Sequence, residues 1–536
     1  MNLKHFFSIA AFALLFVPVA HAETSVDTAA TLPRAQQLYQ QICAVCHGAD
    51  RLGGIGPALI PDNLDRLKPA EAQMVIADGR EATQMAGFKD QLTSEDVAAI
   101  ADWIYTPVAF EPMWDETQIR ASRTVNPDAA RLPAKPVYAA NPKNLFVVVE
   151  AGDSHVTVLD GDKLAPIARF PSRFSLHGGP KYTPDGRYVY FGSRDGWVTK
   201  YDMWNLQVVA EVRAGINMRN IAVSGDGRWV MAANYLPHNL VLFDADDLML
   251  QKIIPAVSLR AIGKSSRVSA VYDAAPRKSF IAAMKDITEV WEISYDPHVE
   301  PVSDGLVHDF QYQEGDFKPG LFTPRRTYLN DYLDDFFFTQ DYDTLMGSSR
   351  DTHKGQVINL DVRRRIADLD IPGMPHLGSG ITWEWKNPQG QTRTVMASTN
   401  LREGVVTVID LDTWEKIKEI PTPGPGFFLR GHEKSPYVWV DSMMSPKFRN
   451  TLTIIDRDKL EVVGSVKVEP GQTLAHIEFT QDGRYALASL MEPAPKGAVI
   501  VYDARTLREV KRIPMNKPIG KYNVFNKTTR SSGTSH

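Results

Sequence analysis

The feature that most restricts the fold of this chain is an internal repeat. Residues 182–212, 223–254 and 479–513 share one pattern: a D-G-R turn, a strand, a polar loop, a second strand ending in Asp, and a further strand. More degenerate copies begin near Leu145, Asp273, Thr327, Arg393 and Tyr437. The eight units recur about every 50 residues or slightly less, a period typical of β-propeller blades. Because D-G pairs favour tight hairpin turns, the repeat predicts an all-β, eight-bladed propeller.

A different motif precedes the repeat, where the chain reads QQICAVCHGADRLGGIGPAL. Cys43 and Cys46 are the only cysteines, and His47 follows directly. A disulfide would close a very small loop and stabilise little, and a thioredoxin-like redox pair would need a βαβ context that the flanks lack. C-x-x-C-H is the attachment motif of c-type haem, with the histidine as an axial ligand. We therefore expect covalent haem c on Cys43, Cys46 and His47.

The flanks of this motif predict a small all-α cytochrome c domain. Residues 32–43 and 93–106 have the apolar spacing of helices, and the second has a Thr or Ser to cap its start. A low-spin haem usually needs a second axial ligand, and a thioether favours the reduced iron. Met85 lies in the loop before the last helix, whereas Met74 lies in a helical stretch where methionine is more often core filler. Met85 is favoured as this ligand, with Met74 or a second histidine as alternatives.

The chain begins with a predicted secretory signal peptide. Lys4 supplies a positive start, residues 6–20 are apolar, and Ala20-His21-Ala22 is an A-x-A cleavage site. An uncleaved anchor is the alternative, but the apolar run is short for a membrane span. We divide the chain into a signal peptide (1–22), a cytochrome c domain (23–106), a Pro-rich linker (107–143) and the propeller (144–536). The mature protein is expected in the periplasm, without a membrane span.

Charge and composition exclude one broad class of function. The 536 residues carry a formal net charge of -5, and the hydrophobic fraction of 43% suits a globular protein. A nucleic-acid-binding protein would usually show a strong basic excess. No nucleic-acid partner is expected.

Three histidines of the propeller have distinctive settings. His177 precedes two glycines, His376 lies in a Pro/Gly loop between repeats, and His476 comes just before a repeat unit. Each one alone would more often anchor a loop. Neutral imidazole suits iron, however, and the attached cytochrome domain suggests that a ligand of the propeller exchanges electrons. The repeat places His177 and His476 on the same face of the propeller.

Together, these features resemble the cytochrome cd1 nitrite reductase family over essentially the whole mature chain. The matching stretches are YQQICAVCHG, FSLHGGPKYTPDGRYVYFGSRDGWVTKYDMW, AANYLPHNLVLFD, GMPHLGSG and GKYNVFN. The resemblance implies that the propeller binds haem d1, a dioxo-isobacteriochlorin with an acrylate side chain. It implies that His177 is the proximal iron ligand. It also implies that Arg194, Arg219 and Tyr235 lie near the macrocycle and its carboxylates, for which arginine is a natural partner.

The resemblance fails at one informative point. Nitrite reductases have two distal histidines that donate protons, and His376 matches one of them. The other should lie about fifty residues earlier, in LFTPRRTYLNDYLDDFFF, which has no histidine. His476, in turn, lies where the reductases have none. This pattern is closer to the NirN-type branch of the family, whose members are dihydro-haem d1 dehydrogenases.

The implied reaction converts dihydro-haem d1 to haem d1, the last step of haem d1 biosynthesis. It turns a propionate into an acrylate and releases two electrons and two protons. On this hypothesis His177 and His476 bind the substrate iron, and His376 is the general base. Tyr522 is a weaker candidate for positioning or proton relay. The electrons leave through haem c to a soluble periplasmic acceptor, and nitrite reductase is a candidate recipient of the haem d1.

Two other functions remain open from the sequence. The first is a cytochrome cd1 nitrite reductase in which Arg325 or Arg326 replaces the missing histidine. The second is a haem d1 carrier or electron-transfer protein without catalysis.

Overall fold

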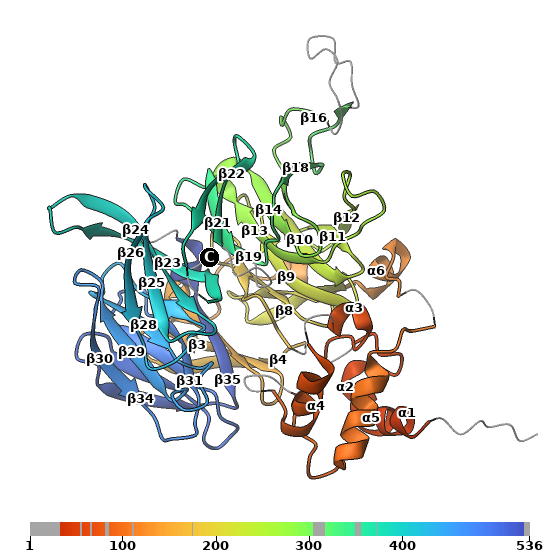
Figure 1. Cartoon of the computed structure of the whole chain (residues 1–536), viewed down its shortest axis with the longest axis horizontal. Helices are drawn as coiled ribbons and strands as arrows, with labels where there is room; N and C mark the ends of the chain where they lie inside the picture. The colour runs from red at the N-terminus through yellow and green to blue at the C-terminus, as the bar shows by residue number, and fades with distance from the viewer. Residues whose placement is uncertain are drawn as a thin grey trace, which may run out of the picture.

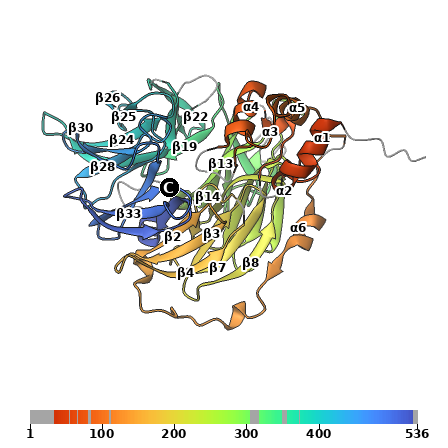
Figure 2. The same cartoon turned by 90° about the horizontal axis from the view of Figure 1, so that it is seen from below.

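The computed structural model describes residues 33–529 except 54–55, 65–66, 81–84, 110–111, 174, 304–316, 349–354 and 372. The predicted signal peptide lies outside the described residues. The described residues form a small helical domain followed by eight β-sheets arranged in a ring (Figures 1 and 2). The predicted eight-bladed propeller is confirmed.

Each blade is a four-stranded antiparallel sheet, and one of them gains a fifth strand. The first four blades along the chain are β5 (Lys181–Tyr182), β6 (Tyr188–Gly192), β7 (Trp197–Asp202) and β8 (Gln207–Arg213); β9 (Asn217–Val223), β10 (Trp229–Leu236), β11 (Asn239–Asp244) and β12 (Leu250–Pro255); β13 (Val268–Ala274), β14 (Ser279–Met284), β15 (Glu289–Ser294) and β18 (Pro324–Tyr328); and β19 (Asp335–Phe338), β20 (Thr344–Ser348), β21 (Gly355–Asn359) and β22 (Arg364–Leu369). The next three are β23 (Pro375–Lys386), β24 (Thr392–Asn400), β25 (Val405–Asp410) and β26 (Lys416–Pro421); β27 (Leu429–Arg430), β28 (Tyr437–Asp441), β29 (Thr451–Asp456) and β30 (Glu461–Lys467); and β31 (Leu474–Phe479), β32 (Tyr485–Leu490), β33 (Ala498–Asp503) and β34 (Glu509–Pro514). A two-stranded ribbon of β16 (Val302–Ser303) and β17 (Phe317–Lys318) projects between β15 and β18.

The eighth blade closes the ring by joining the two ends of the propeller. It combines β2 (Leu145–Glu150), β3 (His155–Asp160) and β4 (Ala165–Pro171) with β35 (Pro518–Asn523), which pairs with β2. A short helix, α7 (Val524–Thr528), follows β35. We call β5, β9, β13, β19, β23, β27, β31 and β35 the inner strands, because from β5 to β35 each contacts the next. β35 meets β5 through the Tyr182 hydroxyl, which donates to the carbonyl oxygen of Tyr522 at 3.3 Å.

The D-G-R turns of the repeat have a common local structure. The Asp185 carboxylate accepts hydrogen bonds from the Thr183 hydroxyl at 2.5 Å and the Arg187 amide at 3.0 Å. Gly186 has a φ of 76°, which a residue without Cβ adopts at little cost. The same turn recurs at 224–228 and 480–484. The turn residues therefore fix where one strand ends and the next begins.

Apolar side chains pack between neighbouring blades. Phe146 and Val148 of β2, for example, are fully buried against Leu487 of β32 and Val499 of β33. Burial of such a side chain contributes roughly 1.5–3 kcal/mol. This cluster joins the first strand of the repeat region to its last full blade, so the ring closes through its core as well as through β35.

The helical domain precedes the propeller. It contains α1 (Arg34–Leu38), a π-helical turn (Tyr39–Cys43), α2 (Ala44–His47), α3 (Pro61–Leu64), α4 (Pro69–Asp78) and α5 (Ser94–Ile104). The Thr93 hydroxyl caps α5 by accepting from the Asp96 amide at 3.2 Å. None of the helices in the described part of the chain has the length and apolar character needed to cross a membrane.

The segment between the two domains packs on the propeller. It contains α6 (Glu116–Ser122), β1 (Thr124–Val125) and two 3₁₀ turns, Ala129–Arg131 and Pro142–Asn144. β1 adds to the edge of β8, and Ile119 of α6 is fully buried in the core of the adjoining blades. Figure 2 shows this segment in orange along β7 and β8. Part of the predicted linker is therefore ordered secondary structure.

Candidate functional site

Every inner strand carries a titratable side chain at the centre of the ring. These are Lys181 (β5), Arg219 (β9), Tyr272 (β13), Asp335 (β19), His376 (β23), Arg430 (β27), His476 (β31) and Lys521 and Tyr522 (β35). The Lys181 ammonium lies 5.3 Å from the ring centre of Tyr272, and it interacts electrostatically with Asp335 and Arg430. These contacts link strands of non-adjacent blades. The inner strands therefore enclose one polar central site.

His177 lies just before β5 and is oriented by the neighbouring blade. Its Nδ1 lies 2.8 Å from the carbonyl oxygen of Arg219. Because that oxygen only accepts, the contact favours a hydrogen on Nδ1 and a lone pair on Nε2. This is the arrangement found when a histidine binds a metal through Nε2. The structure therefore fits the expected role of His177 as an axial ligand.

Two arginines lie against the His177 ring. Nη1 of Arg219 is 2.8 Å from Nδ1 and 2.9 Å from Nε2, and Nη2 of Arg194 is 3.2 Å from Nε2. The site thus combines an imidazole with two guanidinium groups, as a metal-centred macrocycle with carboxylate side chains would require. The residues fit such a ligand.

Tyr235 joins the same cluster of positive charges. The Arg194 guanidinium is 5.6 Å from its ring centre, and the Lys285 ammonium donates to its hydroxyl at 3.1 Å. Burial alone would raise the pKa of Tyr235, but Lys285, Arg219 and Arg194 outweigh it and bring the pKa to about 7. The three predicted cofactor-binding residues therefore meet around His177.

His476 is held in a strained and fully buried position. It has a φ of 49° and stands in a bulge of β31, between residues that pair with β32. Lys521 of β35 donates from its ammonium to the carbonyl oxygen of His476. Positive φ in a residue with Cβ costs free energy and is retained mostly at functional positions. The bulge redirects the side chain out of the regular alternation of the strand.

The His476 ring is neutral, and one of its two nitrogens has no hydrogen-bond partner among the described residues. Burial, followed by the charges of Lys521 and Arg430, lowers its pKa well below the usual value. Among the described residues, its buried Nε2 has no hydrogen-bond partner. The Lys521 amide donates to Nδ1 of the ring at 3.4 Å, so the neutral ring carries its hydrogen on Nε2, and Nε2 could bind iron only after that hydrogen moves to Nδ1 or is lost.

His376 lies at the start of β23, beside a carboxylate of the preceding blade. Its Nδ1 is 3.0 Å from the carbonyl oxygen of Phe427, and its Nε2 is 3.9 Å from Oδ2 of Asp335. Asp335 also accepts a hydrogen bond from the Tyr272 hydroxyl at 2.9 Å. The carbonyl contact again favours a lone pair on Nε2. His376 thus combines an Nε2 lone pair with a carboxylate nearby.

A row of rings connects the two buried histidines with Tyr522. Successive ring centres from His376 through Phe427, Phe428 and His476 to Tyr522 are 4.2, 4.7, 4.5 and 5.0 Å apart. Tyr522 in turn packs against Gly179, where a Cβ would lie 3.1 Å from its ring. Burial raises the pKa of Tyr522 to about 12, so it stays protonated. The row brings residues from four blades to one side of the centre, next to the loop of His177.

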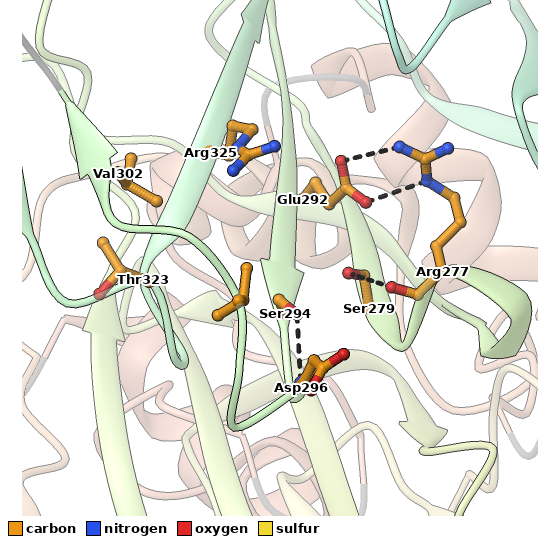
Figure 3. A pocket seen from close by; sticks show the side chains of 10 residues that line it. Arg277, Ser279, Glu292, Ser294, Asp296, Val302, Thr323 and Arg325 are labelled. Carbon is orange, nitrogen blue, oxygen red and sulfur yellow. Dashed lines mark hydrogen bonds and ion pairs between the residues drawn. The ribbon is translucent and has the colours of Figure 1, made fainter. Parts of the chain in front are cut away.

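The structure corrects one sequence-based alternative. Arg325 and Arg326 lie on β18, the outermost strand of its blade, and not on an inner strand. Figure 3 shows Arg325 in a pocket beside Glu292 and Thr323, and Arg326 stacks 4.6 Å from the ring centre of Trp291. Neither can replace a distal histidine at the centre. Asp335, from the same sequence stretch, is the residue that lies beside His376.

Sequence reasoning missed five residues of the central site: Lys181, Tyr272, Asp335, Arg430 and Lys521. Burial lowers the pKa of Lys181 to about 8, and lowers that of Lys521 well below its usual value. The available signal was their position: each stands in an inner strand, near the same point of the repeat.

The second candidate site is the pocket around His47 in the helical domain. Its Nδ1 lies 2.8 Å from the carbonyl oxygen of Pro57, which orients Nε2 for an axial bond. A Cβ on Gly56 would come within 2.6 Å of the His47 ring, so glycine is needed there. Cys43 and Cys46 are free thiols and form no disulfide. These residues fit covalent haem c.

The two methionine candidates differ in exposure. Met74 is 59% exposed on the surface of α4. Met85 is half-buried, and its carbonyl oxygen accepts from the Arg80 amide at 3.0 Å. An exposed thioether would need a rearrangement of α4 to reach a buried iron. This difference supports Met85.

The two sites are joined by a direct apolar contact. Ala58 and Ile60, from the loop after the haem motif, pack on Ile216 and Leu236 of the propeller. Leu236 is the chain neighbour of Tyr235, and the Ile216 amide donates to the Leu236 carbonyl at 2.8 Å. The loop after the haem motif thus packs on a propeller residue that adjoins Tyr235 of the central site.

Comparisons with known proteins agree with this architecture. The family profile described as "Cytochrome D1 heme domain" matches residues 140–527, and that described as "Cytochrome C oxidase, cbb3-type, subunit III" matches residues 30–104. The chain is 52% identical to "Dihydro-heme d1 dehydrogenase" of Pseudomonas aeruginosa over 94% of this chain and 95% of that protein. It is 24% identical to "Nitrite reductase" of Stutzerimonas stutzeri over 97% of each. A solved structure described as "Dihydro-heme d1 dehydrogenase NirN in complex with DHE" superposes with a TM-score of 0.79, at 52% identity, over 93% of this chain and all of that one.

Proposed function

The chain belongs to the cytochrome d1 haem domain family, and on this premise we propose that it is a dihydro-haem d1 dehydrogenase acting in haem d1 biosynthesis. The observation that carries the proposal is the 52% identity to a protein of that name across 94% of the chain, which spans both domains. The central site supports it with three histidines and several buried cations. The proposed substrate is a tetrapyrrole with carboxylate side chains.

The reaction requires a base and a route for electrons. Conversion of a propionate to an acrylate breaks two C–H bonds, forms one C=C bond and releases two electrons and two protons. Haem c, when bound to Cys43, Cys46 and His47, supplies a one-electron acceptor. The chain's own part is to bind and orient the substrate and to accept the protons.

We assign the three histidines on their surroundings. His177, oriented by the Arg219 carbonyl, binds the substrate iron on the proximal side. His476, buried and neutral with an unsatisfied Nε2 among the described residues, binds it on the distal side after its ring hydrogen moves from Nε2 to Nδ1. His376, beside Asp335, is then the general base at the propionate. Tyr522 positions the substrate next to His476.

The remaining assignments concern carboxylates and electron exit. Arg194 and Arg219 hold substrate carboxylates, with Tyr235 between them and Lys285. Haem c, held by Cys43, Cys46 and His47, would accept the electrons, and the contact of Ile60 with Ile216 and Leu236 would hold its domain against the propeller. A soluble periplasmic carrier then receives them, and the product passes on, with nitrite reductase as a candidate recipient. Export by the predicted signal peptide places these steps in the periplasm.

The direct test is an anaerobic conversion. Purified protein is mixed with dihydro-haem d1 and an oxidised one-electron acceptor, and the absorption spectrum is followed. We expect it to become that of haem d1. Tight binding of both tetrapyrroles without conversion would instead identify a carrier, and steady reduction of nitrite to nitric oxide would identify a reductase.

The histidine roles are tested by a pair of variants. His376→Ala should retain binding and lose turnover by roughly 100-fold or more, the usual contribution of a general base. His476→Ala should lose the low-spin, bis-histidine spectrum of the bound tetrapyrrole. The opposite pattern would exchange the two roles. His155→Ala, at the start of β3 and outside the inner strands, is the matched control.

A further inference from the structure

We propose that Asp335 is a positioning residue for His376: its carboxylate stabilises the imidazolium that forms when His376 accepts a proton from the substrate. This inference rests on the proposed dehydrogenase function and adds a residue that the sequence did not identify. It starts from the 3.9 Å separation between Nε2 of His376 and Oδ2 of Asp335, on the neighbouring inner strands β23 and β19.

The separation has a specific chemical meaning. Nδ1 of His376 faces the carbonyl oxygen of Phe427 at 3.0 Å, so Nε2 carries the lone pair of the neutral ring. A lone pair and a carboxylate do not attract each other, and 3.9 Å is too long for a hydrogen bond. Once Nε2 is protonated, the interaction becomes that of an ion pair in a buried site. The carboxylate therefore favours the protonated ring without occupying the nitrogen that must accept the proton.

The position of the carboxylate is fixed from two sides. The Tyr272 hydroxyl donates to Oδ1 at 2.9 Å, and the Phe336 amide donates to the same oxygen at 3.0 Å. Oδ2 is left facing β23. A Cβ added to Gly378 would collide with Oδ2, so glycine at this position makes room for the carboxylate. Gly378 lies in the bulge of β23, two residues after His376.

Other charges also face this pair. Lys181 of β5 and Arg219 of β9 act on Asp335, and Arg430 of β27 acts on Lys181. Tyr272 of β13 has its pKa raised, first by burial and then by the negative charge of Asp335. Asp334 acts on Arg219 as well, and Glu478 and Asp441 act on Arg430, so Asp335 is one of several buried carboxylates, and it is the one that lies 3.9 Å from Nε2 of His376.

The two protons released by the reaction define the role of the Asp335 carboxylate. Two C–H bonds of the substrate break, one C=C bond forms, and the two electrons leave one at a time to the one-electron acceptor named above, which the soluble carrier would reoxidise between them. Each proton is accepted in turn by Nε2 of His376 and is then released to water. Asp335 changes neither the bonds nor the electron count. It lowers the free energy of the state in which His376 carries the proton.

The first test needs no substrate. Protein labelled in its histidine rings is titrated by NMR, and the His376 resonance is assigned by its absence in His376→Gln. In Asp335→Asn the titration of this ring should move to lower pH, because the charged ring loses its counter-charge. Asp341→Asn, which removes a charge from the turn between β19 and β20, should leave the titration unchanged. An unchanged His376 titration in Asp335→Asn would overturn the inference.

The second test measures conversion as a function of pH. In Asp335→Asn the maximal rate should fall roughly 10- to 100-fold, and the acidic limb of the profile should move to lower pH. Binding of dihydro-haem d1 should remain within about threefold. If wild-type protein converts the substrate but the variant keeps the wild-type profile, only this inference fails. If wild-type protein does not convert it, the proposed function fails instead.

A third variant separates position from charge. Gly378→Ala keeps every titratable group but displaces the Asp335 carboxylate. It should reproduce the pH profile of Asp335→Asn. Gly380→Ala strains the same bulge against Met396 rather than Asp335 and is the matched control. Equal effects of the two alanines on the profile would mean that strain, not the carboxylate, matters.

Discussion

The two tetrapyrrole sites of this chain are built in opposite ways. The pocket for haem c takes its two anchoring cysteines, its histidine and the carbonyl that orients the histidine from one short stretch, Cys43 to Pro57. The central site of the propeller takes one or two residues from each of eight inner strands, from Lys181 to Tyr522. A local motif makes the first site, and closure of a ring makes the second.

This difference predicts which structural change would abolish each site. The haem c pocket depends on covalent chemistry and on a few glycines, such as Gly56 against the His47 ring. The central site depends on the eighth blade, whose inner strand β35 comes from the end of the chain. We therefore expect the two sites to be lost independently.

The largest effect is expected from removal of the strand that closes the ring. A chain that ends at Lys517 lacks β35 and α7, and with them the partner of β2. We expect the free energy of unfolding of the propeller to fall by roughly 5 kcal/mol or more, most of a typical domain's stability. Tetrapyrrole binding to the propeller should disappear, while covalent haem c should remain, as measured by its absorption after denaturation.

The control for this truncation is a chain that ends at Thr529 and keeps both elements. It should match the full-length protein in denaturant unfolding and in binding. If the chain ending at Lys517 still bound haem d1, the central site would not depend on ring closure.

The same contrast explains what the sequence could predict. The C-x-x-C-H motif identified Cys43, Cys46 and His47 because haem attachment needs these residues side by side. The three D-G-R turns, which are local structures with their own hydrogen bonds, revealed the repeat, and five degenerate copies of its pattern completed the eight predicted blades. Features that depend only on residues close together in sequence could therefore be predicted without knowledge of the fold.

The central site was only partly predictable. His177, His376 and His476 were found through the family resemblance and their expected loop settings, although His376 and His476 lie on strands β23 and β31. Asp335 and Lys181 were not, because one carboxylate or amine in an apolar strand has no local signal. Only the ring brings Lys181 of β5 near Asp335 of β19. Arg325 and Arg326 were expected near the centre, because sequence spacing alone did not reveal that β16 and β17 are inserted before β18. The two arginines therefore lie on the last strand of their blade.

The second prediction removes the haem c anchor and keeps the propeller. In Cys43→Ala/Cys46→Ala, conversion of dihydro-haem d1 should fall on the order of 1,000-fold, equal to about 4 kcal/mol of activation free energy. Binding should persist, because the central site shares only the apolar contact of Ile216 and Leu236 with the helical domain. Spectroscopic titration under anaerobic conditions measures binding, and stopped-flow absorption measures conversion. Undiminished conversion would show that electrons leave by another route.

The third prediction concerns the second ligand of haem c. Met85→Ala should lower the reduction potential by on the order of 0.2 V, within the ~0.8 V range that axial ligands span. Met74→Ala should leave it unchanged, because that side chain is 59% exposed on α4. Redox titration of the haem c absorption distinguishes them. The reverse result would assign Met74 as the ligand.

The smallest effect is expected from Tyr235, whose pKa of about 7 reflects Lys285, Arg219 and Arg194 overcoming its burial. Carboxylates of a bound tetrapyrrole add negative charge near these cations, so they raise this pKa and binding takes up a proton. By linkage, affinity should fall as pH rises from 6 to 8, by up to about tenfold for one group. Tyr235→Phe should remove this dependence, as measured by titration with haem d1 at both pH values. Tyr502→Phe is the control, because burial raises the pKa of Tyr502 far above this range. A pH dependence that survives in Tyr235→Phe would place the titrating group elsewhere in the central site.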